Sequence, residues 1–157
     1  MFNLRRFMLT GLMLVGAAAL TAAAKPNFTG DWKLNAAKSD FGQFPAPSAM
    51  SQKATHEEPS LKVATKMATD NGDMEFESTY STDGKETTNS FGPNAMKSVA
   101  KWEGDTLTIQ TKGQFGDAEV TIQDKWELSA DGKSITIRRH FASSQGELEQ
   151  KMVLEKQ

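Results

Sequence analysis

Pairs of turn-forming residues recur along most of this chain at nearly regular intervals, and they limit what can lie between them. The pairs are Asn71-Gly72, Asp83-Gly84, Gly92-Pro93, Gly104-Asp105, Gly116-Asp117, Asp131-Gly132 and Gln145-Gly146. Asn-Gly and Asp-Gly adopt positive φ at low cost and favour two-residue hairpins. The segments between the pairs are too short for the helical crossovers that parallel strands require. The spacing therefore predicts an antiparallel, all-β chain of consecutive hairpins.

Apolar and polar residues alternate between these turns. In one segment Leu61, Val63 and Met67 share a face, and the residues between them are mostly polar. Alternation with one polar face is typical of antiparallel strands that cover a single core. The pattern predicts ten strands, of which eight follow Ser60 and two lie earlier, near 28–34 and 50–58.

The segment 35–48 interrupts the alternation. It contains Gly42, Pro45 and Pro47, which predict a loop that holds one helical turn. Consecutive hairpins close naturally into an up-and-down barrel, which removes exposed sheet edges. A β-sandwich is the alternative, but it normally needs longer Greek-key connections, and none is evident. We therefore predict an all-β, antiparallel up-and-down meander barrel of 8–10 strands.

The N-terminus has the composition of an export signal. Arg5 and Arg6 precede an apolar run over 7–20, and small residues follow it. A charged start, an apolar run and an Ala-x-Ala site predict a cleaved signal peptide over 1–24. A retained anchor is the alternative, but the run is shorter than the roughly 20 residues that a spanning helix needs. We therefore expect a periplasmic or secreted domain over 25–157.

Composition excludes several classes of function. The chain has 18 basic and 20 acidic residues, and the acidic excess grows when Arg5 and Arg6 leave with the signal. Such a chain has no basic field for a phosphate backbone, so we expect no nucleic-acid partner. No apolar run after the signal approaches membrane-spanning length, so we expect no membrane partner after signal cleavage. We also expect a monomeric domain. The chain has no cysteine, which excludes disulfides and lipid-modified cysteine.

Motifs for catalysis and metal binding are lacking as well. The sequence contains no Gly-x-Ser-x-Gly elbow, His-Glu-x-x-His motif or phosphate-binding loop. His56 and His140 lie far apart along the chain, so we expect both to face solvent rather than a metal. We therefore predict no enzymatic activity, no metal and no cofactor.

Both ends of the domain resemble known barrel families. The segment 28–34, with Gly30 and Trp32, resembles the opening of the lipocalin and fatty-acid-binding families, in which a Gly-x-Trp motif begins the first strand. The resemblance implies that Trp32 closes one end of a barrel. Four phrases are similar to a mostly uncharacterised group of exported bacterial lipocalin-like (calycin-type) β-barrel proteins: Trp32-Lys33-Leu34-Asn35, Lys38-Ser39-Asp40-Phe41-Gly42, Gln145-Gly146-Glu147 and Val153-Leu154-Glu155-Lys156.

Two features depart from these families. The fatty-acid-binding families insert a helix-turn-helix lid after the first strand, whereas 35–48 contains Gly and Pro. Typical lipocalins often carry a disulfide, which this chain cannot form. The resemblance therefore supports the fold more than any particular ligand.

Two charged residues fall on inward-facing positions. Asp124 shares a face with Ile122 and Trp126, and Arg139 shares a face with Ile137. A buried charge is costly unless it is paired and hydrogen-bonded. Asp124 and Arg139 lie equally far from the turn at 131–132, so we expect them to pair across adjacent strands. A one-residue bulge, the alternative, would turn the neighbouring arginine at 138 inward instead.

The same interior positions suggest a ligand site. A guanidinium group matches a carboxylate bidentately, so Arg139 could hold the polar head of a ligand. The resemblance adds that fatty-acid-binding families use an interior Arg and Tyr in a similar way. The competing interpretation is that Asp124 already satisfies Arg139 and that the pair only fixes the strand register. The candidate ligand-binding residues are Arg139, Tyr80, Asp124, Gln150 and Trp126.

Three functions remain open, and the interior of the barrel separates the first two. We favour an exported lipocalin-like binding protein for a small apolar or amphipathic ligand. The alternative is a protein-interaction module, such as a protease or hydrolase inhibitor, that acts through the 35–48 loop or the region around Lys25. An enzyme ranks last because no motif supports it. An open cavity favours the binding protein, whereas a barrel filled by aromatic side chains favours the interaction module.

Overall fold

The computed structural model describes residues 23–157. Nearly all of the predicted signal peptide, 1–24, lies outside these residues and stays a prediction. No helix in the described part of the chain is long and apolar enough to cross a membrane.

All ten predicted strands are present, and the turn pairs lie between them or at their ends. The predicted helical turn in 35–48 is also present, as the 3-10 helix η1 (Ala36–Lys38). The strands are β1 (Gly30–Leu34), β2 (Ala49–Glu57), β3 (Ser60–Thr69), β4 (Gly72–Ser81), β5 (Asp83–Phe91), β6 (Asn94–Glu103), β7 (Thr106–Phe115), β8 (Ala118–Leu128), β9 (Ser134–Ser143) and β10 (Gly146–Lys156).

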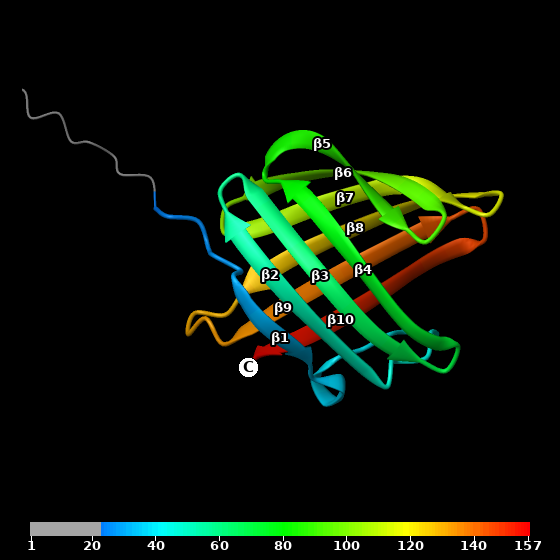
Figure 1. Ribbon diagram of the computed structural model, residues 1–157, viewed down its shortest axis with the longest axis horizontal. Coiled ribbons are helices and arrows are strands. Elements are labelled where there is room, and N and C mark those ends of the chain that lie inside the picture. Colours follow the sequence, from blue (N-terminus) through cyan, green and yellow to red (C-terminus); the bar gives the residue numbers. More distant parts are fainter. Residues whose placement is uncertain (1–22) are drawn as a thin grey trace, which may run out of the picture.

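The strands form one antiparallel sheet that curls into a nearly closed barrel (Figure 1). Its order is β4-β3-β2-β1-β10-β9-β8-β7-β6-β5. The first and last strands pair, with Trp32 opposite Lys156. β4 and β5 are the two edges of the sheet, and no ladder joins them within the described residues. The predicted up-and-down barrel is thus confirmed, with a seam between β4 and β5.

Side chains close this seam. The carboxamide of Asn89 on β5 accepts the backbone N–H of Thr79 on β4 at 2.7 Å and donates to the Thr79 carbonyl at 3.1 Å. It therefore replaces one rung of the missing ladder. Further along the seam the rings of Phe76 and Phe91 pack against each other, with centroids 5.0 Å apart. An amide and an aromatic pair thus bridge the seam where the ladder is missing.

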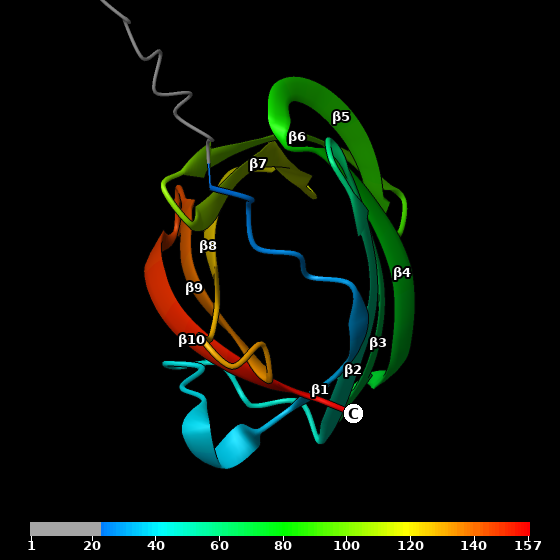
Figure 2. The same cartoon turned by 90° about the vertical axis from the view of Figure 1, so that its left-hand side faces the viewer.

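The segment before β1 runs across one end of the barrel (Figure 2). Its Phe28 is fully buried and stacks on His56 and Trp102, at centroid distances of 5.7 and 5.8 Å. The ring of Trp126 meets Phe28 edge-on at 5.6 Å. Trp32 lies buried at this end, and its indole N–H donates to the Phe28 carbonyl at 2.9 Å. Aromatic side chains thus close this end of the barrel.

His56 is buried in this cluster rather than facing solvent, so that prediction was wrong. The backbone N–H of Phe28 donates to its Nδ1 at 3.2 Å, and Nε2 lies 3.0 Å from Glu58. Glu58 also accepts hydrogen bonds from Trp102 and Thr82. Burial opposes the ionisation of Glu58, but these hydrogen bonds outweigh it and lower its pKa. His56 lies on the inward face of β2 with Gln52 and Ala54, so the alternation along this strand predicts its burial.

The packed core fills only the half of the barrel next to Phe28. Aliphatic side chains from six strands meet there. They are Ala54, Leu61, Val63, Ala100, Leu107, Ile109, Ile135, Ile137 and Leu154. The other half of the barrel is hollow.

The seam amide provides a test of how the barrel closes. Asn89→Ala leaves both backbone groups of Thr79 without their partner, so we expect the free energy of unfolding to fall by about 1–3 kcal/mol. Thr88→Ala, on the exposed face of the same strand, is the matched control and should change it by less than about 0.5 kcal/mol. Urea denaturation measures both. Equal stability of the two variants would show that Asn89 does not hold the seam.

Candidate functional site

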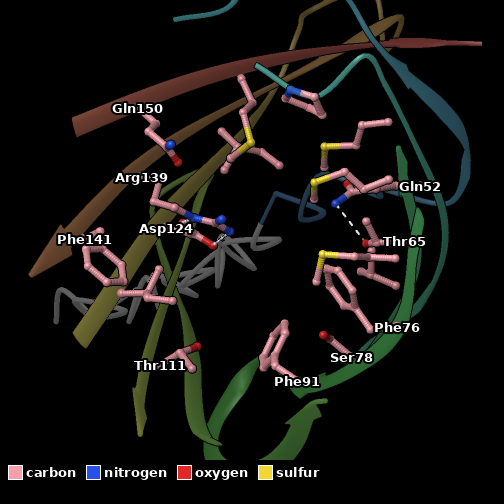
Figure 3. Close-up of a pocket in the computed structure, with 18 of the residues that line it drawn as sticks. Gln52, Thr65, Phe76, Ser78, Phe91, Thr111, Asp124, Arg139, Phe141 and Gln150 are labelled. Atoms are coloured by element: carbon pink, nitrogen blue, oxygen red, sulfur yellow. Dashed lines mark hydrogen bonds and ion pairs between the residues drawn. The ribbon is translucent and has the colours of Figure 1, made fainter. Parts of the chain in front are cut away.

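The hollow half of the barrel contains a cavity of about 390 Å³ (Figure 3). A water molecule takes up about 30 Å³ in the liquid, so the cavity is far larger than a few waters. Its walls come from β2 to β10 and from the 35–48 loop, while Trp126 lines it on the side of the packed core. The barrel is therefore not filled by its aromatic side chains, which is the feature that favours a binding protein.

Most of the cavity wall is apolar and adaptable. Every methionine of residues 23–157 lines it, and these are Met50, Met67, Met74, Met96 and Met152. Phe76, Phe91 and Phe141 contribute aromatic faces. Thioether side chains are unbranched and polarisable, so they fit irregular apolar molecules. Sequence alternation had placed one of them, Met67, on an apolar position.

The predicted ion pair lies in this wall. Arg139 is opposite Asp124 in the β8–β9 register. Arg139 Nε donates to Asp124 Oδ1 at 2.7 Å, and Nη2 donates to Oδ2 at 2.8 Å. Arg138 is exposed, so the bulge alternative does not occur. The pairing inferred from the turn at 131–132 is confirmed.

The guanidinium of Arg139 keeps part of its binding capacity free. Two of its five N–H groups bond to Asp124, and no other hydrogen bond of this side chain occurs within residues 23–157. The side chain is 35% accessible, against 10% for Asp124, and it lines the cavity. Burial opposes its charge, but Asp124 outweighs burial and raises the pKa of Arg139. The cavity therefore contains a permanent cation with donors to spare.

The other predicted site residues also line the cavity. Gln150 is opposite Arg139 on β10, so Asp124, Arg139 and Gln150 form one row across three strands. Gln150 donates to the carbonyl of Phe41 at 3.4 Å, which ties this row to the loop. Tyr80 lies on β4, and burial raises its pKa, so its hydroxyl remains a neutral donor. The structure brings the predicted residues together around one cavity, while their role in binding a ligand stays a prediction.

A second polar pair was not predicted. Gln52 on β2 and Thr65 on β3 are opposite each other, are buried, and line the cavity. In Figure 3 they lie on the wall across from Arg139. Gln52 shares its face with Met50 and Ala54, so strict application of the alternation would have found it.

The far end of the cavity is bordered by exposed apolar side chains. Phe44 in the 35–48 loop, Met74 on β4 and Phe115 on β7 are 56%, 52% and 47% exposed, and all three line the cavity. These are the only large apolar side chains that are exposed in the described residues. Their position at this end indicates the mouth of the cavity.

No group of His, Asp and Glu that could hold a metal ion occurs in the described part of the chain. His56 is enclosed by the aromatic cluster at the closed end. His140 lies elsewhere, with Nδ1 2.7 Å from Glu149. Neither histidine lines the cavity.

Comparisons with known proteins support the fold. No family model and no curated protein matches the sequence. A zebrafish ileal bile acid-binding protein complexed with cholic acid is similar, with a TM-score of 0.58, 16% identity, and coverage of 83% of this chain and 98% of that chain. Secretory abundant heat soluble protein 4 from Ramazzottius varieornatus has a TM-score of 0.54 and 18% identity, with 87% and 99% covered. The fluorescent protein UnaG has a TM-score of 0.53 and 15% identity, with 80% and 95% covered. At these identities the likeness concerns the fold alone, which is that of a calycin-type barrel.

The ion pair provides a second test. Arg139→Met leaves the carboxylate of Asp124 without a cation in a nearly buried site, so we expect a loss of about 3 kcal/mol in the free energy of unfolding. Arg139→Met combined with Asp124→Asn removes both charges and should recover most of that loss. Arg138→Met, on the outer face, is the control. Urea denaturation measures the stability of each variant. Equal stability of the single and double variants would show that Arg139 does not stabilise the carboxylate of Asp124.

Proposed function

We propose that this protein is an exported binding protein for a small amphipathic ligand. The observation that carries the proposal is the cavity of about 390 Å³, with a mostly apolar wall and one arginine that has unused donors. Ligand pockets of this kind combine apolar surface with a few polar groups that fix orientation. The similar zebrafish protein, whose structure contains cholic acid, supports the same class of function.

The polar groups favour an anionic or strongly accepting head. Asp124 accepts hydrogen bonds from only two of the guanidinium N–H groups of Arg139. The remaining donors are on the same side chain, which lines the cavity. The Tyr80 hydroxyl is a further donor on another strand of the wall. A carboxylate near Arg139 would gain charge-assisted hydrogen bonds, and its apolar part would contact the methionine and phenylalanine side chains.

One experiment with two readouts tests the proposal. Native mass spectrometry of protein purified after export should show a bound small molecule and a chain that begins at Lys25. A chain that keeps residues 1–24 would contradict cleavage of the signal, and a chain that stays in the cytoplasm would contradict export. A stoichiometric partner protein in place of a small molecule would favour the interaction module. In that case the exposed Phe44 of the 35–48 loop could contact the partner.

The head-group assignment has a separate test. We expect the combined Arg139→Met and Asp124→Asn variant to bind fatty or bile acids at least tenfold more weakly, because a charge-assisted hydrogen bond contributes about 1.5–3 kcal/mol. Calorimetric titration measures the affinity, and Arg138→Met should match the unmodified protein. Equal affinity of the combined variant would overturn the role of Arg139.

A further inference from the structure

The cavity has polar groups on two opposite walls. Arg139, Asp124 and Gln150 lie on one side, and Gln52 and Thr65 lie on the other (Figure 3). The first group is charged, whereas the second consists of a neutral amide and a hydroxyl. A ligand with a single polar head at Arg139 would therefore leave the second group against its apolar part.

Gln52 has an unmet hydrogen-bonding need. Its Nε2 donates to the Thr65 hydroxyl at 3.3 Å, but its Oε1 is buried and has no partner within residues 23–157. The residue is only 8% exposed, so bulk water is kept from most of the amide. A buried carbonyl oxygen without a donor destabilises the protein, and such groups need an explanation.

The neighbouring side chains on β1 and β3 provide no donor to this oxygen within residues 23–157. Trp32 is directly opposite Gln52 on β1, but its indole N–H already bonds to the Phe28 carbonyl. Beside Thr65, the inward-facing residues of β3 are Val63 and Met67, which both line the cavity and carry no donor. These neighbours leave the oxygen without a donor, and the cavity beside Gln52 is the space from which a ligand can supply one.

We propose that the ligand carries a hydroxyl group that bonds to Gln52, in addition to the acidic head near Arg139. This inference rests on the proposed function and narrows it to hydroxylated amphipathic acids. A hydroxyl suits an amide because it can both donate and accept. The two polar groups of the ligand lie on opposite sides of an apolar skeleton, as the two walls require.

Matched pairs of acids test this assignment by calorimetric titration. The first pair is cholanic acid and cholic acid, which differ in their ring hydroxyls. The second pair is stearic acid and its mid-chain hydroxylated analogue. In at least one pair the hydroxylated acid should bind about fivefold to tenfold more tightly, the effect of one net hydrogen bond.

Gln52→Met keeps the length of the side chain and removes its polar atoms, so it should abolish that preference. It removes an unpartnered oxygen but also the donor to the buried Thr65 hydroxyl, so we expect the two effects on the stability of the ligand-free protein to offset each other. Gln110→Met, on the exposed outer face of β7, is the matched control and should retain the preference.

Each failure has a distinct meaning. If, in both pairs, the unmodified protein binds the hydroxylated acid and its non-hydroxylated counterpart with equal affinity, the hydroxyl assignment is wrong and the proposed function stands. If the preference survives Gln52→Met, the hydroxyl is bound elsewhere and this inference is overturned. If none of the acids binds, the proposed function fails and the inference fails with it.

Discussion

The ion pair between Asp124 and Arg139 lies where the barrel changes from a packed core to a hollow interior. On one side of it Trp126 and Ile137 are opposite each other in the β8–β9 register, and on the other side Ile122 is opposite Phe141. A charge at this depth is stable only with a fixed partner, so the pair holds the two strands in one register. The cavity can therefore contain a cation held in place by its partner, and the proposed ligand site depends on that cation.

Strand number, strand order and this pairing could all be predicted from the sequence. Turn residues and alternation are local signals, and the pairing of 124 with 139 follows from one turn between adjacent strands. The role of Asn89 could not be predicted, because its partner Thr79 is brought near only when the whole sheet curls. Gln52 differs, because the alternation places it on the inward face with Met50 and Ala54, but a polar side chain at such a position does not by itself show that it lines a cavity.

The two ends of the barrel are built on different principles. At the closed end, hydrogen bonds from side chains hold the segment that carries Phe28, and His56 and Trp32 each bond to its backbone. At the mouth, apolar side chains such as Phe44 remain exposed. Stability is thus concentrated at one end, which leaves the other end free to accommodate a ligand.

The seam between β4 and β5 determines where new termini could be placed in a circular permutant of this chain. The first and last strands are joined by a ladder, with Trp32 opposite Lys156, whereas no ladder joins β4 and β5 in the described residues and side chains such as Asn89 bridge them. Linking residue 157 to residue 25 and opening the chain between Ser81 and Asp83 would keep every ladder intact. The resulting circular permutant would form the same sheet as a continuous meander from one edge to the other, so the seam is the natural place at which this barrel can be cut.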